Sequence, residues 1–134
     1  MAALRSTRYW FDSMAHILLA EDDESMRAFL TRALERAGYD VTACADGEEA
    51  VAALDGPWDL LLTDIVMPGT DGIELARIAG EKRPGAPIMF ITGFAAVSLA
   101  AAEAAAPGAK VLSKPIHLRE IVAEIEKVVG AAAA

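Results

Sequence analysis

The chain is short of the residues on which several classes of protein depend. Its 134 residues include one cysteine, Cys44, which cannot form an internal disulfide. A small extracellular scaffold held by disulfides is therefore excluded, and a reducing cytoplasm fits this cysteine usage. Bases are scarce as well, since 12 Lys and Arg stand against 20 Asp and Glu, a formal net charge of −8. Because binding to nucleic acid needs clustered Lys and Arg, no nucleic-acid partner is expected.

Long uninterrupted apolar segments are also missing. The longest stretch without a charged residue runs from Pro84 to Ala102, and Gly85, Pro87 and Gly93 interrupt it. Such a stretch does not predict a membrane span, so no membrane partner is expected. Hydrophobic residues nevertheless make up 54% of the chain, which is too many for a disordered protein. The composition predicts one cytoplasmic domain with a substantial core.

The two ends of the chain do not fit the pattern of its body. Residues 1–13 are mildly basic and have no apolar segment long enough for a secretory signal, whereas Met14 leads directly into a predicted strand. We predict an N-terminal extension over 1–13, either disordered or the product of a misassigned start, a folded domain over 14–130, and an alanine tail over 131–134.

Apolar runs alternate with helical patterns along the body. The runs that begin at Ile17, Leu60 and Ile88 are continuous, which is typical of strands buried on both faces of a parallel sheet. Two further runs cover 41–44 and 109–112. The helical patterns lie at 26–37, 48–54, 72–82, 95–106 and 118–129. This alternation predicts an α/β fold, (βα)5, with a doubly wound five-stranded parallel sheet in the flavodoxin-like order 2-1-3-4-5.

Polar residues follow the predicted strands. Glu21 and Asp22 come after the first strand, Asp64 ends the third, Thr92 ends the fourth, and Lys114 follows the fifth. Ligands of such sheets bind beyond the carboxyl ends of the strands, where these side chains should meet. Several carboxylates in one crevice need a cation or a proton, and oxygen ligands without His or Cys suit Mg²⁺. Carboxylate, Mg²⁺, hydroxyl and lysine are together the components of phosphoryl transfer.

Four segments at these strand ends resemble the response regulator receiver (CheY-like) domain. They are ILLAEDDESMR at 17–27, LTDIVMPGTDG at 62–72, FITG at 90–93 and SKP at 113–115. The resemblance covers about residues 14–130, and four motifs in the right order are highly specific. Residues 60–76 and 90–96 further resemble the CpdR-type single-domain regulators of alphaproteobacteria.

The resemblance implies a role for each of these residues. Asp64 would accept a phosphoryl group from a phosphohistidine, Thr92 would hydrogen-bond that group, and Lys114 would pair with its charge. Asp22 would ligate Mg²⁺ directly and Glu21 through water. The implied metal ligands are thus Glu21, Asp22, Asp64 and the backbone carbonyl of Val66. The Lys114–Pro115 peptide bond matches one that is usually cis in this family.

One position departs from the family pattern. Val111 stands three residues before Lys114, where the family often has an aromatic switch residue. Phe94 is either a substitute gate or a residue that packs under the alanine-rich helix. The other conspicuous side chains are expected to be structural or solvated: Asp23, Glu24, Cys44, Trp58, Met67, His16 and His117.

The resemblance implies a signalling switch and not an enzyme. Its phosphodonor would be a histidine kinase or histidine phosphotransferase, and a downstream protein, with a ClpXP-type protease as one candidate, would bind the face of the alanine-rich helix, the fifth strand and the last helix. The alternative is a shuttle that passes the phosphoryl group to another histidine. An aspartyl phosphatase is disfavoured because Val66 stands where its general acid would be. A flavodoxin would need a Ser/Thr/Gly-rich loop after the first strand, and this chain has acids there.

Overall fold

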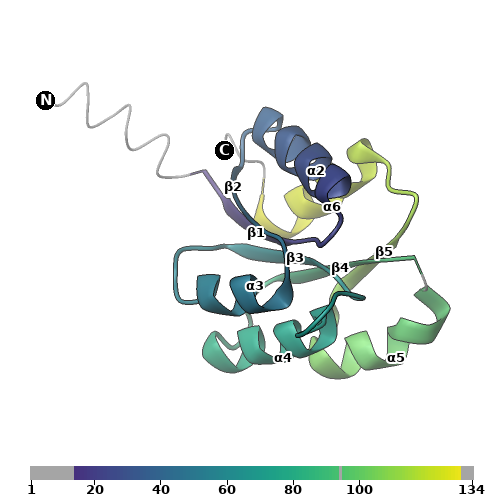
Figure 1. Cartoon of the computed structure of the whole chain (residues 1–134). Helices are drawn as coiled ribbons and strands as arrows, with labels where there is room; N and C mark the ends of the chain where they lie inside the picture. Colours follow the sequence, from purple (N-terminus) through teal and green to yellow (C-terminus); the bar gives the residue numbers. More distant parts are fainter. Residues whose placement is uncertain (1–13, 94, 131–134) are drawn as a thin grey trace, which may run out of the picture.

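Strands and helices alternate throughout residues 14–93 and 95–130, which are the part of the chain that the computed structural model describes (Figure 1). The strands are β1 (His16–Ala20), β2 (Asp40–Cys44), β3 (Leu60–Asp64), β4 (Ile88–Thr92) and β5 (Lys110–Ser113). The helices are α2 (Glu24–Arg36), α3 (Gly47–Ala53), α4 (Gly72–Lys82), α5 (Ala95–Ala105) and α6 (Leu118–Val129). The predicted extension over 1–13, the alanine tail over 131–134 and Phe94 lie outside the described residues.

The five strands form one parallel sheet in the order β2-β1-β3-β4-β5. The predicted fold class and strand order are therefore confirmed. Helix α4 begins after Asp71, which caps it by accepting a hydrogen bond from the Glu74 N–H. Helix α3 begins at Gly47, one residue earlier than the pattern indicated, because Asp46 caps it in the same way.

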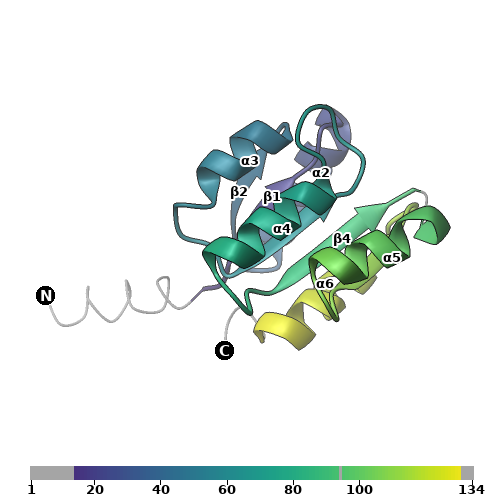
Figure 2. The ribbon, with the colours of Figure 1, turned by 90° about the horizontal axis from the view of Figure 1, so that it is seen from below.

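Two apolar layers cover the sheet, one on each face. Helices α2 and α6 lie on one face, and α3, α4 and α5 lie side by side across the other (Figures 1 and 2). Successive strand side chains point to opposite faces, so Ile17 and Leu19 of β1 pack under α2 and α6 while Leu18 packs under the other three helices. This double burial explains why the central strands are continuously apolar.

The helical patterns at 26–37 and 118–129 place Phe29 and Val128 on the apolar faces of α2 and α6, but both side chains are exposed. Phe29 of α2 is 48% exposed and Val128 of α6 is 47% exposed. Leu30 and Leu34, four residues apart on α2, are the fully buried pair that reaches the sheet. Phe29 lies about 100° around the helix from Leu30, so it borders the groove between α2 and α6 instead of the core.

Several residues expected to be structural are confirmed as such. Cys44 is buried, and burial together with nearby acids raises the pKa of its thiol to about 11. Met67 is buried too, as is Trp58, whose Nε1 donates to the Leu54 carbonyl at 3.0 Å. His16 Nε2 lies 2.7 Å from the Thr42 hydroxyl.

Two further expectations concern the helix starts and the membrane. Asp23 is exposed, as predicted, but it also caps α2 by accepting from the Met26 N–H at 2.8 Å. His117 precedes α6 without a side-chain capping bond.

No helix in the described part of the chain is both long enough and apolar enough to cross a bilayer.

The contrast between Leu30 and Phe29 gives a test of the layer arrangement. Leu30→Ala should lower the free energy of unfolding by about 2–5 kcal/mol, because it leaves a cavity against the sheet. Phe29→Ala should lower it by about 1 kcal/mol or less, because that ring is half exposed. Urea unfolding followed by circular dichroism measures both values, and equal losses would contradict the described packing.

Candidate functional site

The sheet places the predicted site residues at one edge. Glu21 continues the line of β1, and its backbone N–H donates to the Cys44 carbonyl at 3.1 Å. Asp64 is the last residue of β3 and lies in register with Ile91 of β4. Thr92 ends β4, and its carbonyl accepts from the Lys114 N–H at 2.8 Å. Neighbouring parallel strands that end at the same level therefore bring these residues together.

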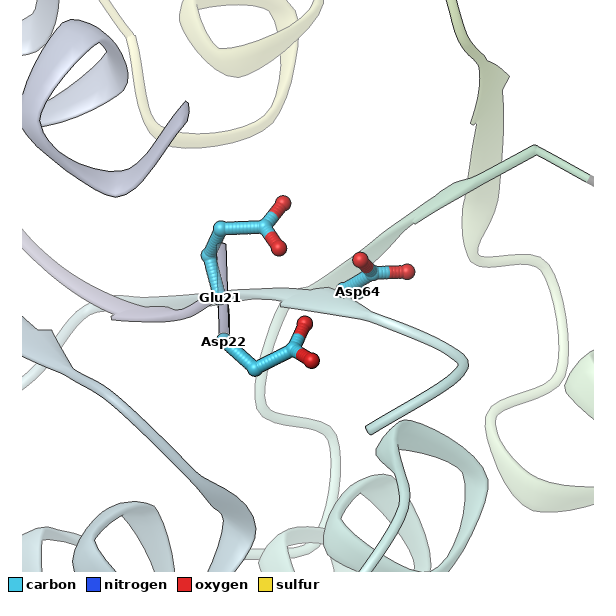
Figure 3. A group of neighbouring side chains, drawn as sticks. All are labelled: Glu21, Asp22 and Asp64. Atoms are coloured by element: carbon cyan, nitrogen blue, oxygen red, sulfur yellow. The ribbon is translucent and has the colours of Figure 1, made fainter. Parts of the chain in front are cut away.

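Three carboxylates converge at this edge (Figure 3). One carboxylate oxygen from each of Glu21, Asp22 and Asp64 lies within 4.8 Å of the others. Glu21 is fully buried and Asp64 nearly so, at 5% exposure, whereas Asp22 is exposed. Figure 3 shows the three side chains directed toward a common space. Like charges this close repel, and burial strengthens the repulsion because water screens it less.

Lys114 supplies the opposing charge. Its Nζ lies 2.9 Å from Asp64 Oδ2 and 3.4 Å from Glu21 Oε1. Partial burial lowers the pKa of Lys114, but the hydrogen bond to Asp64 and the charges of Asp64 and Glu21 outweigh that effect and leave the pKa above its ordinary value. The lysine is therefore charged at neutral pH, and one cation faces three carboxylates.

The pKa of Glu21 reflects this excess of negative charge. Burial, with the charge of Asp64, raises the pKa of Glu21 from 4.5 to about 7, although the Asp23 N–H that donates to Oε2 at 3.1 Å acts in the other direction. Glu21 Oε1 has no hydrogen-bond partner among the described residues. Its nearest cation is Lys114 Nζ, at 3.4 Å. A buried carboxylate oxygen that accepts no hydrogen bond, beside two other carboxylates and no His or Cys, fits a hard divalent cation.

The structure also describes other residues singled out in the sequence. The Thr92 side chain is fully buried at the end of β4. Val66 is 58% exposed, and its backbone N–H donates to Asp64 Oδ1 at 3.3 Å. Val111 is partly buried and packs against the core under α3, α4 and α5. The Lys114–Pro115 bond is cis, as predicted.

Some residues that shape the site carry no obvious chemical signal in the sequence. Arg27 Nη1 donates to the Glu21 carbonyl at 2.9 Å and so ties α2 to the acidic loop. Gly72 lies so close to Asp64 that a Cβ there would be 2.0 Å from the Asp64 carbonyl oxygen. Its only sequence signal is the Asp-Gly pair at 71–72, which indicates a turn but not this close approach.

The raised pKa of Glu21 predicts how stability depends on pH in metal-free solution. Between about 4.5 and 7 the folded chain binds more protons at Glu21 than the unfolded chain does. The free energy of unfolding should therefore fall as pH rises through this range, by on the order of 1–3 kcal/mol. Glu21→Gln cannot ionise and should lack this fall. Urea unfolding at several pH values in a chelating buffer measures both slopes, and parallel slopes would contradict the assignment.

Comparison with known proteins agrees with the fold and identifies the family. Residues 17–126 match the family model of the response regulator receiver domain. The chain is 60% identical over 120 residues to the response regulator receiver protein CpdR of Brucella abortus, a match that covers 89% of this chain and 100% of that protein.

Solved structures give the same result. A response regulator receiver protein from Sinorhizobium medicae matches with a TM-score of 0.81 and 30% identity, over 89% of this chain and 97% of that one. The response regulator TrrA from Thermotoga maritima, solved in complex with Mg²⁺-BeF, matches with a TM-score of 0.78 and 28% identity, over 86% of this chain and 99% of that one. The chain therefore belongs to the response regulator receiver domain family of two-component signalling.

Proposed function

We propose that this chain is a single-domain response regulator of a phosphorelay, which accepts a phosphoryl group on Asp64 and thereby changes its binding to partner proteins. The observation that carries the proposal is the pairing of the nearly buried Asp64 with Lys114 at 2.9 Å, inside a cluster of carboxylates that needs a further cation. TrrA, which has the same fold, was solved with Mg²⁺-BeF, and this supports Mg²⁺ as the cation.

The metal would be held by oxygen atoms alone. Asp22 and Asp64 would bind it directly, Glu21 through water, and Val66 through its backbone carbonyl. When bound, Mg²⁺ would offset the charge of these carboxylates and of the phosphoryl oxygens. Asp22 is exposed while Glu21 is buried, so the cluster is open to solvent on the side of Asp22. A phosphoryl donor would approach from that side.

The transfer itself uses this chain's carboxylate as the nucleophile. An oxygen of Asp64 forms a bond to phosphorus while the bond from phosphorus to the donor's histidine nitrogen breaks, and the imidazole keeps the electron pair. The Lys114 ammonium, already at Oδ2, pairs with a phosphoryl oxygen once that carboxylate has become an acyl phosphate. The Thr92 hydroxyl donates to another phosphoryl oxygen.

The residue two positions after Asp64 argues for a switch and against a phosphatase. Val66 has an apolar side chain that is 58% exposed, so it provides no group that could donate or accept a proton at the phosphorylated aspartate. Without such a group, hydrolysis of the acyl phosphate would have less assistance, which favours a phosphorylated state that a partner could bind.

The partners would be proteins at two separate places. A histidine kinase or histidine phosphotransferase would meet the edge that carries Asp64. A downstream protein would bind the face of α5, β5 and α6, where Leu99 and Val128 are 52% and 47% exposed around a hollow of about 1030 Å³. A ClpXP-type protease in the cytoplasm is one candidate for this partner. The alternative function is a shuttle, which would return the phosphoryl group to another histidine without a downstream target.

Replacement of Asp64 tests the chemistry. Incubation with acetyl phosphate and Mg²⁺ should produce a retarded band of the wild-type chain on a phosphate-affinity gel, and Asp64→Ala should abolish it. Asp23→Asn is the matched control, because it removes a neighbouring carboxylate but keeps the capping oxygen, and it should be phosphorylated nearly as fast as the wild type. A chelator should prevent phosphorylation of the wild type and of Asp23→Asn. An unshifted wild type would refute the proposal.

A binding assay separates the switch from the shuttle. Purified ClpX should bind the chain with a different affinity before and after treatment with acetyl phosphate and Mg²⁺, while Asp64→Ala should show no change with treatment. Equal binding of both forms, together with rapid return of the phosphoryl group to a purified histidine phosphotransferase, would favour the shuttle.

A further inference from the structure

The loop that follows Asp64, residues 65–71, is fixed at its base by close backbone contacts. The Gly72 N–H donates to the Ile65 carbonyl at 2.8 Å, and the Asp64 carbonyl lies against Gly72 where no side chain would fit. The loop carries Val66, whose backbone carbonyl is a metal ligand in the proposed function. These contacts fix the two ends of the loop. The position of the Val66 carbonyl also depends on contacts made by the residues between those ends.

A second anchor comes from α3. The Glu48 Oε2 atom accepts from the Thr70 N–H at 3.2 Å and from the Thr70 hydroxyl at 3.3 Å. The same carboxylate covers Gly69, where a Cβ would lie 2.5 Å from either oxygen and where φ is +71°, a conformation that favours glycine. Gly47 completes the contact, since a Cβ there would be 1.8 Å from the Thr70 carbonyl oxygen.

Glu48 is well suited to hold a loop. Its carboxylate is an ionised acceptor for two donors of one residue, which gives stronger hydrogen bonds than a neutral acceptor. It lies in the first turn of α3, where a negative charge is favourable. The carboxylates that meet at the cluster are those of Glu21, Asp22 and Asp64, so any effect of Glu48 on the site would pass through the loop.

We propose that Glu48 is a positioning residue. Its hydrogen bonds with Thr70 hold the 65–71 loop in the conformation that presents the Val66 carbonyl to the metal beside Asp64. This inference rests on the proposed function and extends it to a residue on a different helix, 22 positions away from Thr70 in the sequence. Loss of the contact between Glu48 and Thr70 would leave the carboxylates of Glu21, Asp22 and Asp64 in place and loosen only the Val66 carbonyl.

The neighbouring glutamate provides a matched control. Glu49 lies in the same first turn, but its carboxylate accepts from the Ala45 N–H at 2.7 Å and so stabilises the start of α3 and not the loop. Glu49→Ala therefore removes the same charge and one hydrogen bond without touching Thr70. Glu48→Gln keeps an acceptor oxygen and should recover most of the function that Glu48→Ala loses.

Three measurements on the full chain test the proposal. In metal-free protein, the Thr70 amide should exchange its hydrogen at least about threefold faster in Glu48→Ala than in the wild type. The Mg²⁺ dissociation constant measured by calorimetry should rise about 3–10-fold, below the usual range for a lost outer contact because only one of the ligands is affected. Phosphorylation by acetyl phosphate should need correspondingly more Mg²⁺, with the rate at saturating Mg²⁺ within about twofold of wild type.

The outcomes are distinct. Unchanged Mg²⁺ affinity in Glu48→Ala, with a wild-type chain that is phosphorylated normally, overturns the role of Glu48 and leaves the proposed function intact. An equal loss in Glu49→Ala also overturns it, because the effect would then come from a looser α3. A wild-type chain that neither binds Mg²⁺ nor accepts a phosphoryl group overturns the proposed function and this inference together.

Discussion

The repulsion among three carboxylates at the end of the sheet is the constraint on which the rest of the site depends. Glu21, Asp22 and Asp64 lie within 4.8 Å of one another, and two of them are buried. Such an arrangement needs an opposing charge or a proton, and Lys114, which follows β5, provides the charge at 2.9 Å from Asp64. Because a single lysine does not balance three acids, the cluster is suited to a further cation.

The rest of the fold supplies the rigidity that this arrangement needs. Strands β1, β3 and β4 are clamped between two apolar layers, so their carboxyl ends are held at fixed positions. The loops beyond those ends are held by contacts that take no part in the chemistry. Arg27 binds the carbonyl of Glu21, and Gly72 allows the backbone of α4 to touch that of Asp64. Charged side chains thus meet in a narrow space because neutral packing and backbone contacts leave them little freedom.

Much of this could be predicted from the sequence, and the exceptions share a physical cause. The continuous runs at Ile17, Leu60 and Ile88 predicted a parallel sheet correctly, and the residues after each strand indicated which carboxylates would meet. The exposure of Phe29 could not be predicted, because helical spacing does not fix which edge of an apolar stripe meets the sheet. The contacts of Glu48 and Gly47 with Thr70 were also missed, since they join the start of a helix to a loop that is distant in the sequence and show no periodicity.

The lone thiol described with the core has a practical consequence. Cys44 is 4% exposed with a pKa near 11, so at neutral pH it is both shielded and protonated, and a thiol in that state reacts slowly with alkylating reagents. A cysteine introduced at an exposed position such as Val128 would therefore be labelled selectively, without first removing the native thiol. Spectroscopic probes can therefore be attached to single cysteines introduced on either face of the domain while Cys44 is kept.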